Sequence, residues 1–193
     1  MRFEDMNGNA PPTPDPEFTI TTLAAGAMEP GSWHAVERIF FLSAAPRDFA
    51  TPDERREFLD RWTGYYLEHE PESIFLATDQ GGRVAGYLTG CVDSRGAARL
   101  YRDIPYFALF EDYFAAYPAH FHINCHPWFR NRGIGTKLVE AYLERCAHDG
   151  LPGVHVVTAA AARNVAFYRR RGFDVSVTRR WRGEELLFLA TRL

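Results

Sequence analysis

The sequence predicts a single α/β domain with a mixed sheet of about six to seven strands, about four helices and an insertion at residues 94–118. Strand-like segments are interleaved with segments of helical period, and two pairs of strands are separated by short turns, which predicts hairpins. A strand–helix–strand step between residues 119 and 158 requires a right-handed crossover and therefore a parallel pair. The length of 193 residues fits one domain.

The composition narrows the class of protein. The chain is 46% hydrophobic and 24% charged, with a net charge of −3, so no overall basic field favours nucleic acid or an acidic membrane. Cys91, Cys125 and Cys146 are odd in number and form no CxxC, which argues against a disulfide framework or a thiolate zinc site. The sequence has no apolar run of membrane-spanning length and no signal-peptide pattern, so we expect a cytoplasmic protein.

The first half of the chain begins with an arm at residues 1–17 that is broken by prolines, so the folded domain is expected to span 18–193. Ser32 is the expected cap of a helix that runs to about residue 42. Thr51 and Glu54 around Pro52 predict the start of a second helix, to about residue 69. Strands are expected at 18–23, 73–78 and 83–92.

The second half carries the crossover. Residues 94–118 hold seven aromatic side chains around Pro105, and because a structureless loop this long is uncommon, we expect a short helix over 106–116. Gly172 is expected to end the last helix. The remaining elements are strands at 119–125, 154–158, 173–178 and 185–191, and helices at 134–148 and 163–171.

The loop between strand 119–125 and helix 134–148 has the features of a phosphate site. Its sequence is Arg130, Asn131, Arg132, Gly133, Ile134, Gly135 and Thr136, followed by Lys137. The first turn of a helix has unpaired N–H groups and the positive end of the dipole, and the glycines let a diphosphate approach the backbone. The patterns GxGxxG and GxxxxGK[ST] are absent, which disfavours a dinucleotide or ATP site. The alternative is a plain glycine-bearing turn.

RNRGIG at 130–135 resembles the R/Q-x-x-G-x-G/A signature of the GNAT superfamily of N-acetyltransferases, and ARNVAFYRRRGF at 162–173 resembles the second segment of that family. The resemblance covers roughly 18–193, apart from 94–118. YPAHFHINCHP at 117–127, with GVH at 153–155, further resembles the acetyltransferase-like domain of eukaryotic O-GlcNAcases and its free-standing bacterial relatives. The eukaryotic domain lacks the glycine loop and is regarded as a pseudo-acetyltransferase, whereas this chain keeps the loop.

The resemblance implies that strands 119–125 and 154–158 splay apart and that acetyl-CoA is the co-substrate. Pantetheine would pair with the backbone around Ile123, Asn124 and Cys125, and the pyrophosphate would take the amides of 132–136. Asn164, Phe167 and Tyr168 would face the cofactor. The acceptor would be a small-molecule or peptide amine, and the last hairpin leaves a homodimer possible.

The chemistry needs an acid for the leaving thiolate and a base for the amine. The resemblance makes Tyr168 the acid; the alternative is a tyrosine that only packs. His122, and after it His120, are the candidate bases, since histidine titrates near neutral pH and both lie on one face of strand 119–125. They are alternatively ordinary strand histidines. Asp93 acting through water is another candidate, because the glutamate that many relatives carry on this strand is absent.

Other uses of these residues stay open. His120, His122, His126 and His155 form a candidate metal site, but the third ligand would come from the phosphate loop, so we expect no metal. Cys125 faces away from His122, which favours a structural thiol over a nucleophile. One arginine of 169–171 or 179–180 is a candidate for the 3′-phosphate, and the aromatics of 101–117 either shape the acceptor site or form core.

From the loop and the family resemblance together, we expect an N-acetyltransferase. The rival interpretation is a non-catalytic acetyl-CoA-binding or peptide-binding module.

Overall fold

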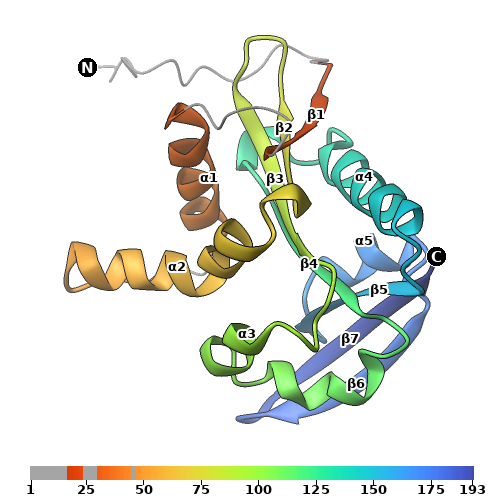
Figure 1. The fold of residues 1–193 in the computed structure, drawn as a ribbon. Coiled ribbons are helices and arrows are strands. Elements are labelled where there is room, and N and C mark those ends of the chain that lie inside the picture. Colours follow the sequence, from red (N-terminus) through yellow and green to blue (C-terminus); the bar gives the residue numbers. More distant parts are fainter. Residues whose placement is uncertain (1–16, 24–29, 45–46) are drawn as a thin grey trace.

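The computed structural model describes residues 17–23, 30–44 and 47–193. It contains one seven-stranded sheet with the strand order β1-β2-β3-β4-β5-β7-β6 (Figure 1). The predicted arm at 1–17 lies outside the described residues except for Glu17. The strands are β1 (Thr19–Thr22), β2 (Ile74–Thr78), β3 (Val84–Cys91), β4 (Ala119–Cys125), β5 (Gly153–Ala159), β6 (Val175–Trp181) and β7 (Glu184–Arg192).

Helices cover both faces of the sheet. On one face, α1 contacts β3 and β4 and α2 contacts β3, while α4 contacts β2 to β5 on the other face (Figure 1). The helices are α1 (Pro30–Ser43), α2 (Pro52–His69), α3 (Ala98–Asp103), α4 (Ile134–His148) and α5 (Val165–Arg169), with 3₁₀ turns η2 (Pro71–Ser73), η3 (Phe107–Tyr113) and η4 (Pro127–Phe129). No helix in the described part of the chain is long and apolar enough to cross a bilayer.

The parallel pair predicted from the crossover is confirmed. β4 and β5 are parallel, but they pair only at Ala119–Val154 and His120–His155. β5 stays paired with β7 over its full length, and β4 stays paired with β3 up to Cys125. The two central strands therefore separate beyond His120, as the resemblance implied.

The capping patterns in the sequence predicted some element boundaries correctly and others incorrectly. Thr51 caps α2 as predicted, because its hydroxyl accepts the N–H of Glu54 at 3.1 Å. The first helix begins at Pro30, so the prediction that Ser32 caps it is wrong. The helix expected at 163–171 is shorter, at Val165–Arg169, and the helix expected at 106–116 is the 3₁₀ turn η3. Helix α3 was not predicted.

The insertion packs against the sheet rather than standing free. Phe110 stacks on Phe188 of β7 with centroids 5.4 Å apart, and Phe114 stacks on His155 at 4.9 Å. Phe107, Phe110 and Phe114 are buried, so these aromatics are core. Because they cover β5 and β7 next to the point where β4 separates, the insertion also forms one wall of the region between the strands.

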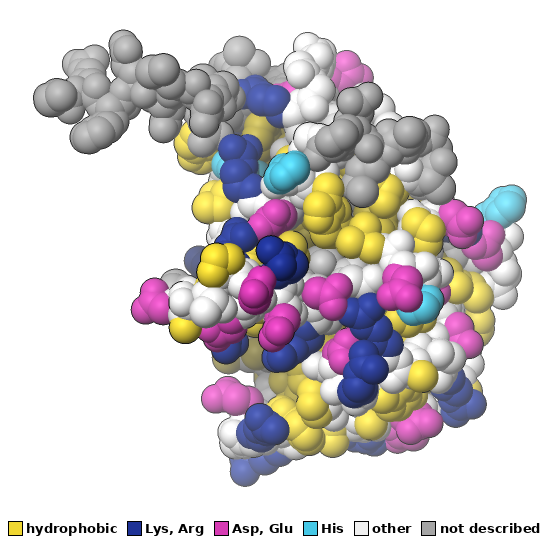
Figure 2. Space-filling model, turned by 60° about the vertical axis from the view of Figure 1, so that its left-hand side comes forward, with side chains coloured by type: hydrophobic (Ala, Val, Ile, Leu, Met, Phe, Trp, Pro, Cys, Tyr) yellow, Lys and Arg dark blue, Asp and Glu magenta, His cyan; other side chains and the backbone are white. Residues whose placement is uncertain are grey.

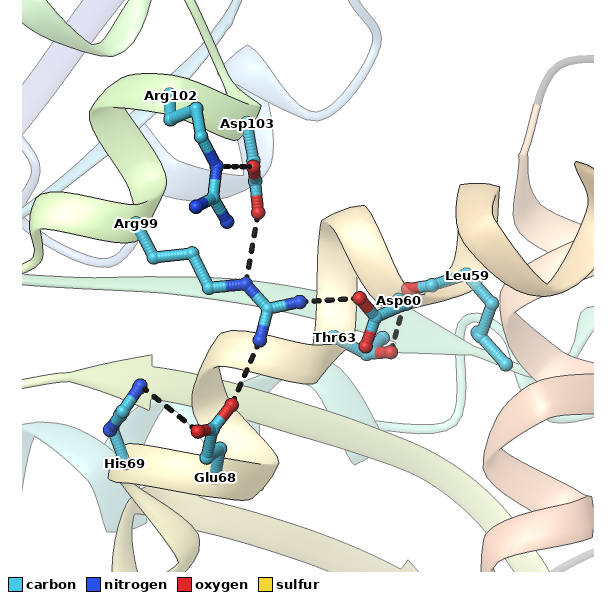
Figure 3. A network of polar contacts seen from close by, with 8 residues as sticks. All are labelled: Leu59, Asp60, Thr63, Glu68, His69, Arg99, Arg102 and Asp103. Atoms are coloured by element: carbon cyan, nitrogen blue, oxygen red, sulfur yellow. Dashed lines mark hydrogen bonds and ion pairs between the residues drawn. The ribbon is translucent and has the colours of Figure 1, made fainter.

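Arg99 holds the insertion against α2 (Figure 3). Its guanidinium, on α3, bonds Glu68 and Asp103 at 3.0 Å each and also bonds Asp60. Gly64 permits this approach, since a Cβ there would lie 2.9 Å from the Arg99 guanidinium. This network belongs to the α1–α2 side of the molecule, where a band of mixed acidic and basic side chains crosses the surface with hydrophobic side chains above and below it (Figure 2).

Candidate active site

A groove of about 710 Å³ lies between the start of α4, the end of β4 and α5. It contains most of the residues that the sequence assigned to a cofactor, together with residues that the sequence did not assign. Its lining is formed by Ile123, Cys125, Phe129, Arg130, Asn131, Gly133, Ile134, Gly135, Thr136, Arg163, Asn164, Phe167, Tyr168, Arg170 and Arg171.

The predicted phosphate loop leads into the N-terminus of α4. Asn131 and Gly133 have φ angles of 62° and 78°, in the left-handed region that Asn and Gly tolerate best. Gly133 is the N-cap of α4 and provides no side-chain cap. The first intrahelical bond runs from the Lys137 N–H to the Gly133 carbonyl at 3.0 Å, so the N–H groups of the turn before it have no acceptor within the helix.

Gly135 allows α5 to approach this turn. A Cβ at Gly135 would lie 3.3 Å from Cζ of Phe167, tighter than ordinary contact. A larger residue there would force Phe167 away and would narrow the groove at the amides. The glycine thus brings the wall formed by α5 close to the helix N-terminus.

Arginines give the groove its charge. Arg171 donates to Oγ1 of Thr136 from Nη2 at 2.6 Å and from Nε at 3.1 Å, and its guanidinium lies 5.6 Å from the centroid of the Phe167 ring. Arg130 donates from Nε to the Cys125 carbonyl at 3.1 Å. Arg170 and Arg171 belong to the 169–171 group that the sequence offered for the 3′-phosphate. The sequence did not assign Arg163 or Phe129 to the site, although the position of Arg163 beside Asn164 in the second family segment was an available signal.

Three predicted cofactor residues do not line this groove. The Asn124 side chain lies on the opposite face of β4, where its Nδ2 donates to the Tyr87 hydroxyl at 2.8 Å. Lys137 Nζ lies 3.4 Å from the Phe18 carbonyl. Arg132 is also absent from the lining. Alternation along a strand and the turn of the helix direct these side chains elsewhere, although their backbone lies where the sequence placed it.

Tyr168 lies at the inner end of the groove. Its ring is buried against Phe121, Phe167 and Phe173, with centroid distances of 5.3 to 6.0 Å. Burial, and to a smaller extent the Cys125 thiol, raise the pKa of Tyr168 well above its ordinary value. Within the described part of the chain its hydroxyl has no hydrogen-bond partner, so it keeps its proton at neutral pH and is free to donate it.

His120 is fully engaged by neighbouring groups. Its Nε2 lies 2.9 Å from the Tyr66 hydroxyl and its Nδ1 lies 2.7 Å from Oγ of Ser94. Burial, and then the nearby His155 and His122 rings, hold the pKa of His120 well below its usual range. With both ring nitrogens bonded, His120 supports the structure and has no nitrogen available to an amine.

His122 differs from its neighbour. It lines a cavity of about 250 Å³ between α1, α2 and the sheet, and also a small one of about 20 Å³ beside the insertion. Its ring meets Trp62 edge-on at 5.7 Å, and it has no hydrogen bond to the residues that the structure describes. Burial lowers the pKa of His122 to about 4, so the imidazole is neutral and can accept a proton.

Cysteine and metal chemistry have little support. Burial raises the pKa of Cys125 to about 11, and its side chain faces the groove, on the opposite side of β4 from His122. The thiol is therefore not activated by histidine. Among the described residues, no group of three or more His, Cys, Asp or Glu side chains is arranged to hold a metal ion.

Comparisons with known proteins agree with this geometry. The profile of the acetyltransferase (GNAT) family matches residues 33–173. Similar solved structures include SsHAT, with 24% identity, a TM-score of 0.69 and coverage of 92% of this chain and 98% of that one. The ribosomal-protein-S18-alanine N-acetyltransferase from Escherichia coli has 18% identity, a TM-score of 0.58 and coverage of 91% and 94%. A chain of the NatC complex bound to Gag peptide and CoA has 12% identity, a TM-score of 0.60 and coverage of 92% and 99%. The chain belongs to the acetyltransferase (GNAT) family.

Proposed function

We propose that the chain is an acetyl-CoA-dependent N-acetyltransferase that transfers an acetyl group directly to an amine within a ternary complex. The observation that carries this proposal is the shape of the groove. It has uncapped helix amides and arginines at one end and the protonated Tyr168 at the other, next to the point where β4 and β5 separate. The Tyr168 phenol and the His122 imidazole lie on opposite sides of β4 without hydrogen bonds to the residues that the structure describes. A non-catalytic binding module would not require two such groups.

The residues of the groove fit the cofactor. The amides at the start of α4 and the guanidinium of Arg171 would bind the diphosphate, with Arg163 or Arg170 beside the 3′-phosphate. The exposed backbone of Ile123 to Cys125 would hydrogen-bond the pantetheine amides. When bound, the cofactor supplies the acetyl group as an activated thioester.

Two side chains then manage protons. His122, which is neutral and has no hydrogen bond to the residues that the structure describes, accepts the proton that the amine loses. His120 does not, since both of its ring nitrogens are bonded. Tyr168 donates its proton to the thiolate that leaves, because burial keeps the phenol protonated until then. A backbone N–H of β4, at the separated part of the strand, stabilises the developing oxyanion.

Finer assignments belong to the same proposal. The relation to the acetyltransferase-like domain of O-GlcNAcases is supported by residues 117–127 and 153–155 of the sequence. The acceptor is an amine of a small molecule or a peptide, and the proposed location is the cytoplasm. A homodimer through the edge strand β6 would be compatible with the sheet order.

CoA-dependent thermal stabilisation tests the cofactor site, since a ligand of the native state raises Tm. Arg171→Gln and Arg163→Gln should each reduce the Tm shift that CoA produces. Arg169→Gln is the matched control, because Arg169 lies in α5, between Arg163 and Arg171 in the sequence, but does not line the groove. Equal losses in all three variants, or no stabilisation of the wild type, would contradict the assignment of the groove.

Release of free CoA thiol from acetyl-CoA across a panel of amines tests turnover. Tyr168→Phe should lower kcat by about tenfold to a hundredfold or more, the range of positioned acid catalysis, with little change in CoA-dependent stabilisation. Stabilisation of the wild type without thiol release for any amine would support the binding module instead.

A further inference from the structure

The cavity of about 250 Å³ on the α1–α2 face has a composition that selects its occupant. It lies across β4 from the cofactor groove, with His122 in its wall. Clefts that take drug-sized ligands are about 300–1,000 Å³, so this one suits a smaller molecule or a single side chain. Its described lining is formed by Phe40, Ser43, Ala44, Phe58, Trp62, Tyr87, Thr89, His122 and Asn124.

The walls are aromatic and uncharged. Phe40, Phe58, Trp62 and Tyr87 provide apolar surface that favours an apolar body over a polyol, which would need many hydrogen-bonding groups. The 5.7 Å edge-to-face contact between Trp62 and His122 brings this apolar surface directly beside the unpartnered imidazole. An amine held by its apolar body would therefore have its nitrogen near His122.

A guanidinium lies at the edge of the cavity. None of the described residues that line it is charged. The guanidinium of Arg130 lies 3.3 Å from Oγ of Ser43, and that of Arg47 lies 5.1 Å from the centroid of the Phe58 ring. Arg47 is balanced by Glu54 at 3.6 Å outside the cavity. Because the described lining residues include no carboxylate, an acceptor with a second ammonium group would meet the Arg130 guanidinium rather than an ion-pair partner.

We propose that this cavity receives an acceptor whose amine is carried on a small apolar or aromatic body without a second positive charge, and that this amine lies next to His122. The role of the occupant as acetyl acceptor rests on the proposed function, but its binding does not. Binding and turnover are therefore measured separately.

The charge selectivity is tested with n-hexylamine and 1,6-diaminohexane, which share one chain and differ in the second ammonium. Titration calorimetry of the full chain at pH 8, with and without CoA, should give a Kd for n-hexylamine at least about tenfold lower than for the diamine. 2-Phenylethylamine should bind at least as tightly as n-hexylamine because of the aromatic walls. Equal or tighter binding of the diamine, or no binding of either monoamine, would overturn the proposal.

Thiol release separates this inference from the proposed function. Binding of n-hexylamine without thiol release would support the cavity assignment and contradict the acetyltransferase. Thiol release with 1,6-diaminohexane or glucosamine, but not with either monoamine, would retain the acetyltransferase and overturn the cavity assignment.

Discussion

Two buried neutral histidines should make the fold sensitive to mild acid. His155 donates from Nδ1 to the Tyr117 carbonyl at 2.7 Å, between the rings of Phe114 and Phe188. Burial lowers the pKa of His155 to about 3, and it holds the pKa of His120 well below its usual range. Burial removes the water that would solvate a charged imidazolium, so the native state resists protonation at both positions.

The sign and size follow from proton linkage. The unfolded chain takes up protons at these histidines as the pH falls below about 6.5. The native state takes up a proton at His155 only near pH 3. The free energy of unfolding that these two neutral histidines contribute is therefore fully present above about pH 6.5 and decreases as the pH falls. At pH 5.5 the difference is about 1.4 kcal/mol per histidine. His120 and His155 together should therefore remove about 3 kcal/mol of the free energy of unfolding between pH 7.5 and pH 5.5, out of a typical 5–15 kcal/mol.

Urea unfolding at pH 7.5 and 5.5 measures the total loss, and carboxylates titrate mostly below this range. His122, whose pKa burial lowers to about 4, adds a similar contribution, so a variant of one histidine is needed to isolate its share. In His155→Phe the loss should be smaller than in the wild type by about 1.4 kcal/mol, although the variant is less stable at pH 7.5 because the Tyr117 carbonyl loses its donor. His148→Ala, at an exposed position, is the control and should leave the loss unchanged. An equal loss in His155→Phe and the wild type would refute the reasoning.

Three further outcomes are expected. Gly90→Ala would place a Cβ 2.2 Å from the buried Tyr142 ring. It should therefore lower the free energy of unfolding, measured in urea, by about 1–3 kcal/mol or more. Wild-type stability of this variant would contradict the packing. Arg99→Ala should lower the free energy of unfolding by about 1 kcal/mol, because it removes three ion pairs. Arg102→Ala, at an exposed position, should not differ measurably from the wild type. Equal effects of the two substitutions would argue against the network. With His122 as the base, kcat/KM measured by thiol release should decrease on the acid side with an apparent pKa near 4 rather than 6.5. This acid limb should disappear in His122→Ala. An acid limb that persists in the variant would show that another group is titrating.

The sequence determined the elements whose signals are short in range. β4 and α4 have the predicted bounds, and Thr51 begins α2 as its capping pattern indicated. The crossover from β4 through α4 to β5 required a parallel pair of strands. Gly133 and Gly135 marked the uncapped turn that forms one end of the groove. These features depend on neighbours within a few residues, so the local pattern was sufficient.

Only the tertiary structure shows which groups each side chain at the site contacts. His120 and His122 have the same sequence signal, but His120 meets Tyr66 and Ser94, 54 and 26 residues away, while His122 faces an open cavity. Arg171 reaches Thr136 across 35 residues. Such contacts depend on which elements the completed fold brings together, and periodicity along one strand or helix reports only the face on which a residue lies.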